Sequence, residues 1–149
     1  MTGMALNREF LGRVYPPTEP YEVGRERIRE FAAAVGDTAA ATHDVAAARA
    51  LGYADLVAPP TFPITLSMRA EEQATHDPEL GLDFSRVVHR QQEFVCDRPV
   101  LAGDVLTVVL TVVEVDEAAG NDVVTTVSEI RTTAGERVCT ATSTMVARP

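Results

Sequence analysis

Side chains that can move a proton gather in one short polar stretch of an otherwise alanine-rich region. Residues 37–44 read DTAAATHD, which brings together the carboxylates of Asp37 and Asp44, the hydroxyl of Thr42 and the imidazole of His43. Imidazole and carboxylate groups are common general acids and bases in enzymes. The sequence therefore predicts that any proton-transfer chemistry of this chain is located in this stretch.

Three helices are expected to position the polar stretch. Apolar residues recur at helical spacing over 25–35, and Gly36 supplies the stop. A second helix, capped by an aspartate, is expected over 44–51, with Gly52 ending it. A third helix is expected from residue 60 or 61 to residue 75, with an apolar first half that is buried and a polar second half that is exposed.

Strands are expected in the second half of the chain, where β-branched residues dominate. The expected strands cover residues 87–96, 105–115, 123–130 and 138–146, with hairpin turns at 118–121 and 133–136. Four antiparallel strands after a helical half predict an α+β fold in which the sheet wraps around the third helix. No linker or repeat divides the sequence, so one domain is expected over residues 1–149.

Composition excludes several classes of partner. The formal net charge is −9, which opposes nonspecific binding to nucleic acid or to an anionic membrane. No apolar run approaches the roughly 18 residues that a membrane span requires. Cys96 and Cys139 lack the spacing of a metal site or a redox pair, so they are expected to be small core residues in a reducing cytoplasm.

The polar stretch and its surroundings resemble those of MaoC-like (R)-specific enoyl hydratases and 3-hydroxyacyl dehydratases. Those proteins carry a G-D-x-N-P-x-H-x-D loop and, later, a P-V-x-x-G-D turn. Here Gly36 and Asp37 match the start of the loop, Asp44 matches its end, and residues 99–104 match the turn. The resemblance implies a hot-dog fold, in which an antiparallel sheet wraps around a long central helix.

The residues expected for catalysis depart from that family. In the family, the loop Asp and His move a proton at C2 and water at C3 of a thioester, and a backbone N–H at the start of the central helix polarises the carbonyl. Asp37 matches the Asp, but Thr42 falls at the position of the His. His43 comes one residue late, and one step along an extended loop turns a side chain to the opposite side. Pro60 stands where the family has Gly and has no N–H to donate.

This loop without its His, together with residues 21–30 and 51–62, is similar to a narrower group. The group is the substrate-binding subunit of heterodimeric (3R)-hydroxyacyl-acyl-carrier-protein (ACP) dehydratases of type II fatty-acid elongation. The similarity implies that this chain binds an acyl-ACP or acyl-CoA thioester while a partner hot-dog subunit supplies the Asp-His pair. It also implies a hydro-lyase with no metal or redox cofactor, whose isolated substrate-binding subunit is inactive.

Residues near the start of the third helix and on the first long strand are the candidates for contact with a thioester. They are Pro60, Thr61, Phe62, Ile64, Arg86, His89 and Arg90. Thr61 retains an N–H and a hydroxyl, and arginines such as Arg86, Arg90 and Arg98 suit a phosphate. Phe62 and Ile64 are equally expected in a plain core, and His89 on a solvated strand face.

Two other functions remain open from the sequence. One is a non-catalytic, homodimeric hot-dog module that binds a thioester or another protein. The other is a homodimeric enoyl hydratase that uses Asp37 and His43 as its acid/base pair. Structural roles are open for the same residues, because Asp in such loops commonly bonds nearby backbone N–H groups and a loop His is often solvated.

Overall fold

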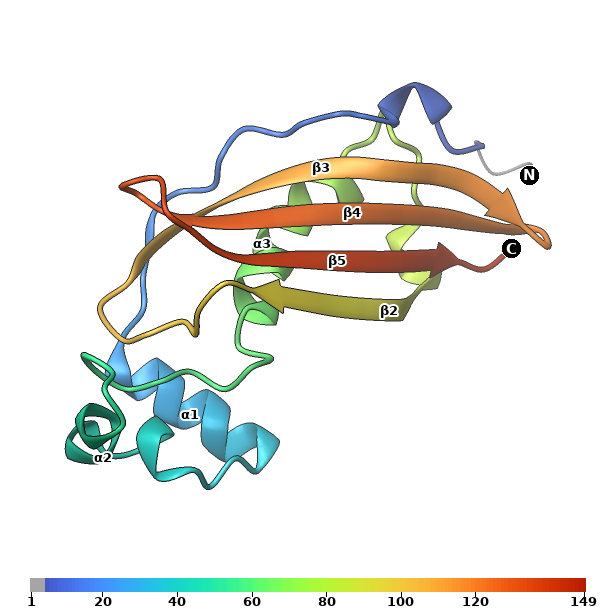
Figure 1. The fold of residues 1–149 in the computed structure, drawn as a ribbon. Helices are drawn as coiled ribbons and strands as arrows, with labels where there is room; N and C mark the ends of the chain where they lie inside the picture. Colours follow the sequence, from blue (N-terminus) through green and yellow to red (C-terminus); the bar gives the residue numbers. More distant parts are fainter. Residues whose placement is uncertain (1–4) are drawn as a thin grey trace.

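An antiparallel sheet of five strands, curled along its length, forms the centre of the fold in residues 5–149 (Figure 1). The computed structural model describes residues 5–149, so residues 1–4 of the predicted domain lie outside the described part. The strands are β1 (Tyr21–Glu22), β2 (Val87–Cys96), β3 (Val105–Ala118), β4 (Asn121–Thr132) and β5 (Arg137–Ala147). Their order in the sheet is β1-β3-β4-β5-β2, so β2 is an edge strand. The four long strands lie where the β-branched runs predicted them.

Three α-helices accompany the sheet. They are α1 (Arg25–Val35), α2 (Val45–Ala50) and α3 (Ile64–Thr75), and the short 3-10 turns are η1 (Arg8–Phe10), η2 (Ala40–Thr42) and η3 (Phe84–Arg86). Gly36 ends α1 as predicted, with a left-handed φ of 74°. Asp44 caps α2 as predicted, because its carboxylate accepts the N–H groups of the first turn. Within residues 5–149, no helix combines the length and the apolar character that crossing a membrane requires.

Helix α3 begins at Ile64, later than the predicted start at residues 60–61. The chain enters the helix through a tight turn, in which the N–H of Phe62 donates to the carbonyl of Pro59 at 2.9 Å. Pro63 has no N–H, so the α-helical bond from position 63 back to Pro59 cannot form. The prolines therefore replace the first α-helical turn by a tighter turn, in which each hydrogen bond joins residues three positions apart.

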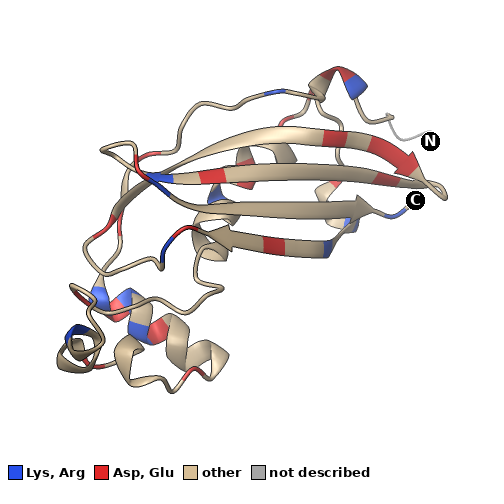
Figure 2. Cartoon of the chain, in the orientation of Figure 1, with Lys and Arg blue, Asp and Glu red and all other residues tan. Residues whose placement is uncertain are grey.

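The core lies between α3 and the inner face of the sheet, with α3 packed against β3 and β4 (Figure 1). Fully or almost fully buried side chains alternate along β3, as a sheet with one covered face requires. The expectation that the second half of α3 is exposed holds for Arg69 and Glu72 but is wrong for the residues between and after them. Glu71 is only 6% exposed, and Ala74 and Thr75 are buried, because the helix stays against the sheet beyond its first half. Figure 2 shows β5 without charged side chains beyond its first residue.

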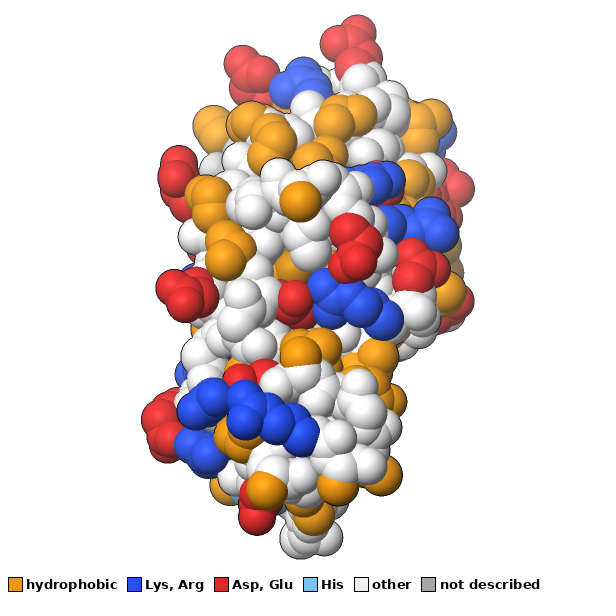
Figure 3. All heavy atoms as spheres, turned by 60° about the vertical axis from the view of Figure 1, so that its left-hand side comes forward, with side chains coloured by type: hydrophobic (Ala, Val, Ile, Leu, Met, Phe, Trp, Pro, Cys, Tyr) orange, Lys and Arg blue, Asp and Glu red, His pale blue; other side chains and the backbone are white. Residues whose placement is uncertain are grey.

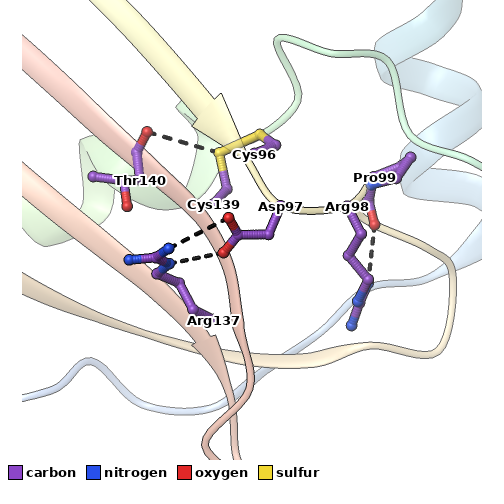
Figure 4. The surroundings of a disulfide bond; sticks show 7 residues. All are labelled: Cys96, Asp97, Arg98, Pro99, Arg137, Cys139 and Thr140. Atoms are coloured by element: carbon purple, nitrogen blue, oxygen red, sulfur yellow. Dashed lines mark hydrogen bonds and ion pairs between the residues drawn. A yellow bond between two sulfur atoms is a disulfide. The ribbon is translucent and has the colours of Figure 1, made fainter.

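Cys96 and Cys139 form a disulfide, which corrects the expectation of two free core cysteines (Figure 4). The two residues are direct cross-strand partners in β2 and β5. Their sequence separation of 43 residues is unlike the short spacing of a redox motif, so only the strand register reveals the pair. Cys139 is fully buried as predicted, whereas Cys96 is exposed.

A charged clamp fixes the turn between β2 and β3. The guanidinium of Arg98 donates two bonds to the carboxylate of Asp104, each 2.9 Å long, and its Nε donates to Glu136 at 2.7 Å. The same carboxylate accepts the N–H of Leu101 at 2.8 Å. Hydrogen bonding to Asp104 raises the pKa of Arg98 above its ordinary value. Gly103 within this turn has a φ of 93°, a conformation that residues with a Cβ rarely adopt.

Candidate functional site

A cavity of about 650 Å³ lies between the polar loop, the turn before α3 and the end of β2. The loop contributes Asp37, Ala39, Ala41 and Thr42, and the turn contributes residues 57–61 and Pro63. The remaining wall comes from Phe94 and Cys96 on β2 and from residues 97–100 after it. Most of the lining is apolar. Ligand sites are commonly apolar, with a few polar protein groups that orient the ligand.

The loop places Asp37 and Thr42 in the wall of this cavity and leaves His43 outside it. The Asp37 carboxylate accepts the N–H of Ala39 at 2.9 Å, and the Thr42 hydroxyl donates to the carbonyl of Ala39 at 2.8 Å. Thr42 is 4% exposed. The ring of His43 is exposed, and its Nε2 lies 2.9 Å from the backbone carbonyl of Asp37 rather than from its carboxylate. The η2 turn thus directs residue 42 inward and residue 43 outward.

The polar groups of the cavity can bind a ligand but do not form an acid/base pair. A threonine hydroxyl cannot act as a base near neutral pH. Asp37 keeps one carboxylate oxygen on the loop backbone, so it also has a structural role. Pro60 offers no N–H, whereas Thr61, which lines the same cavity, has an N–H without a hydrogen-bond partner among residues 5–149.

The predicted thioester contacts fall into two separate groups. Pro60 and Thr61 line the cavity. Phe62 is fully buried beside it, with its ring edge-on to Phe31 at 5.4 Å between centroids. Ile64 is half-buried in the first turn of α3 and does not line the cavity.

Arg86, His89 and Arg90 lie at the opposite end of β2 from the cavity. His89 lines a second cavity of about 270 Å³, next to α3. Arg86 pairs with Asp83 at 3.2 Å, and Arg90 is the extra residue of a β-bulge. The structure therefore does not bring these three residues to the first cavity.

Arginines also gather on the lobe formed by α1 and α2, in a chain whose net charge is negative (Figure 3). Arg25 pairs with Asp55 at 2.8 Å, and its hydrogen bond lowers the pKa of that carboxyl to about 2. Arg29 donates to the carbonyl of His43 at 3.0 Å and so links α1 to the polar loop. Arg29 therefore holds the polar loop in place, and Arg25 ties the start of α1 to the segment after α2.

Apart from Arg98, sequence reasoning missed one wall of the cavity. Phe94, Cys96 and Asp97–Val100 line it because β2 ends beside the turn before α3. An isolated bridge between Val57 and Leu101 and the bond from the N–H of Ala58 to the carbonyl of Val100 hold the two segments together. In this segment the P-V-x-x-G-D turn indicated a fold rather than a site, and Arg98 was named only as a candidate for a phosphate. The structure places Arg98 in the cavity wall, with its guanidinium bonded to Asp104 and Glu136.

Comparisons with known proteins agree with this geometry. Residues 9–141 match the family described as "FAS1-like, dehydratase domain region". A UPF0336 protein of Streptomyces avermitilis is 56% identical over 145 residues, 97% of each chain, and one of Thermobifida fusca is 53% identical over 97% of this chain and 95% of its own.

Two solved structures are similar over almost the whole chain. One is a C-terminally truncated HadBC (3R-hydroxyacyl-ACP dehydratase) complex from Mycobacterium tuberculosis, with a TM-score of 0.81 and 34% identity over 94% of this chain and 99% of that chain. The other is a MaoC-like dehydratase, with a TM-score of 0.85 and 34% identity over 93% of this chain but only 42% of that longer chain. The predicted α+β hot-dog fold and the MaoC-like resemblance are confirmed.

Proposed function

Because the chain belongs to the FAS1-like dehydratase-region family, we propose that it is a subunit of a (3R)-3-hydroxyacyl-thioester dehydratase. In this proposal the chain binds the acyl thioester, and a partner hot-dog subunit supplies the Asp-His pair. The observation that carries the proposal is the cavity wall, which contains Asp37 and Thr42 but not His43. A cavity suited to an acyl group is thus present without the imidazole that the reaction needs.

The edge of the sheet supports a protein partner. Strand β2 has ten residues and, among residues 5–149, pairs with β5 alone, so its other side presents backbone N–H and C=O groups without a strand partner in that range. Val88 and Val95 on this strand are 42% and 59% exposed, and Phe84 before it is 53% exposed. Long exposed edges with apolar side chains favour pairing with another strand. The similar HadBC structure is a complex, which agrees with a protein partner for this chain.

Two alternatives use the same features differently. A homodimeric binding module would pair β2 with β2 of a second copy and catalyse nothing. A homodimeric enoyl hydratase would need the His43 ring to leave the Asp37 carbonyl and enter the cavity. The heterodimer is favoured because it requires no such rearrangement of the loop.

Turnover with and without a partner tests the proposal. The chain is purified alone and co-expressed with a hot-dog protein that keeps the full G-D-x-N-P-x-H-x-D loop, and formation of the enoyl thioester is followed by absorbance. We expect the complex to exceed the isolated chain by about 10²–10⁴-fold, the usual contribution of acid/base groups. No metal or redox cofactor is added, and the complex is proposed to act in the cytoplasm on an acyl-ACP or acyl-CoA.

Two results would contradict it. Full turnover by the isolated chain that disappears in both Asp37→Asn and His43→Ala would establish the homodimeric hydratase. Thioester binding without turnover and without co-purification of any such partner would establish the binding module.

A further inference from the structure

A row of polar side chains crosses the inner face of the sheet, where β3 presents apolar residues to the core. Gln92 on β2 lies opposite Ser143 on β5, which lies opposite Thr126 on β4. Ser128 stands one row closer to the first cavity, in line with Ala141. Ser143, Thr126 and Ser128 are 0% exposed. We call Gln92, Ser143, Thr126 and Ser128 the polar row.

Several atoms of the polar row have no hydrogen-bond partner among residues 5–149. They are both side-chain amide atoms of Gln92 and the hydroxyl oxygens of Thr126 and Ser128, together with Oε1 of Glu71 on the facing helix. Buried polar atoms are almost always satisfied, by protein groups or by water. A group of such atoms in one patch therefore favours contact with polar ligand atoms or water over contact with a hydrocarbon.

The helix changes character in the same place. Pro63 lines the first cavity, and Ser67 and Glu71 follow on the same side of α3, one and two turns further on. At 1.5 Å per residue, Glu71 lies about 12 Å beyond Pro63. Both Ser67 and Glu71 are buried. Where α3 packs on the sheet, the side chains of both therefore change from mostly apolar to polar with increasing distance from the first cavity. We call this contact region the seam.

The far side of the polar row opens into the second cavity. Glu71 and His89 both line this cavity, and the Nε2 of His89 lies 3.0 Å from the Ser143 hydroxyl. Phe94, which lines the first cavity, is the next inward-facing residue after Gln92 on β2. The two cavities thus lie at the ends of one seam, with Gln92 between them.

We propose that the polar row and Glu71 end the acyl-binding chamber and limit the substrate to short acyl chains that the first cavity holds. The inference rests on the proposed function. Each methylene of the acyl chain that leaves water favours binding. A methylene against the polar row also displaces water from polar side-chain atoms, and it offers them no hydrogen bond in return. Affinity therefore increases with chain length only until the chain end reaches Gln92.

A chain-length series in the reconstituted complex tests the inference. Substrates run from 3-hydroxybutyryl to 3-hydroxypalmitoyl thioesters, and kcat/KM is measured for each. We expect Gln92→Met, and more strongly Gln92→Met with Glu71→Met, to raise the palmitoyl-to-butyryl ratio of kcat/KM by about tenfold per unsatisfied group removed. The matched control is Thr142→Val, next to Ser143 but on the other face of β5, which should leave the ratio unchanged.

Affinity for non-reactive acyl thioesters, measured by calorimetry on the same variants, separates binding from turnover. An unchanged ratio and unchanged affinities in folded Gln92→Met, with thioesters still bound, would overturn the inference alone. Absence of binding and turnover for every chain length in the wild-type complex would instead overturn the proposed function.

Discussion

Replacing Glu71 with Gln is expected to raise the free energy of unfolding near pH 8 by about 3 kcal/mol. Burial between α3 and the sheet raises the pKa of Glu71 from 4.5 to about 7, although a bond with Ser143 opposes part of the shift. Between these two values the folded chain holds a proton that the unfolded chain has lost. Stability therefore falls as the pH rises from about 4.5 through about 7, and Gln removes this loss because it does not ionise.

Urea unfolding of wild type and Glu71→Gln across this pH range measures the effect. The two proteins should have similar stability near pH 4 and should diverge as the pH rises. The matched control is Glu72→Gln, because residue 72 is the exposed neighbour on the same helix, and it should change stability by less than about 0.5 kcal/mol. Parallel pH profiles for wild type and Glu71→Gln would contradict the buried, protonated state of this carboxyl.

Replacing Asp104 with Ala is expected to lower the free energy of unfolding by about 2 to 3 kcal/mol. The Asp104 side chain is 13% exposed. Its carboxylate accepts hydrogen bonds from both terminal nitrogens of Arg98 and from the N–H of Leu101. Its removal leaves a partly buried guanidinium and a backbone donor without their main acceptor. The range is below that of a fully buried pair because the Arg98 side chain is 28% exposed.

Glu136→Ala is the control for this clamp, because Glu136 binds the same guanidinium but is 54% exposed. It should cost less than about 1 kcal/mol, as exposed ion pairs do. Equal losses in the two variants, measured by chemical denaturation, would show that the clamp does not depend on the buried carboxylate.

The sequence predicted the ends of helices well where a single residue determines the end. Gly36 ends α1 because it adopts a left-handed φ, and Asp44 begins α2 because its carboxylate accepts the first N–H groups. The start of α3 was placed too early because Pro63, which removes a helical donor, was not weighed against the favourable position of Pro60.

Features that depend on how strands far apart in the sequence pair with one another could not be predicted from the sequence. The Cys96–Cys139 disulfide and the polar row exist because of the register of β2, β5 and β4. The bulge at Arg90 shifts the alternation on β2, so it decides that Gln92 faces inward. Glu71 stands among charged residues and resembles a solvated helix face, yet the sheet covers it.

The division of labour between two subunits can be measured directly in the reconstituted heterodimer. Turnover of a (3R)-3-hydroxyacyl thioester is compared after Asp→Asn and His→Ala substitutions in the polar loop of one subunit at a time. In this chain, Asp37→Asn and His43→Ala should each change kcat by no more than about threefold, whereas the same changes in the partner loop should lower it by about 10²–10⁴-fold. A comparable collapse of turnover from Asp37→Asn or His43→Ala, with the partner loop intact, would contradict the assignment of this chain as the substrate-binding subunit.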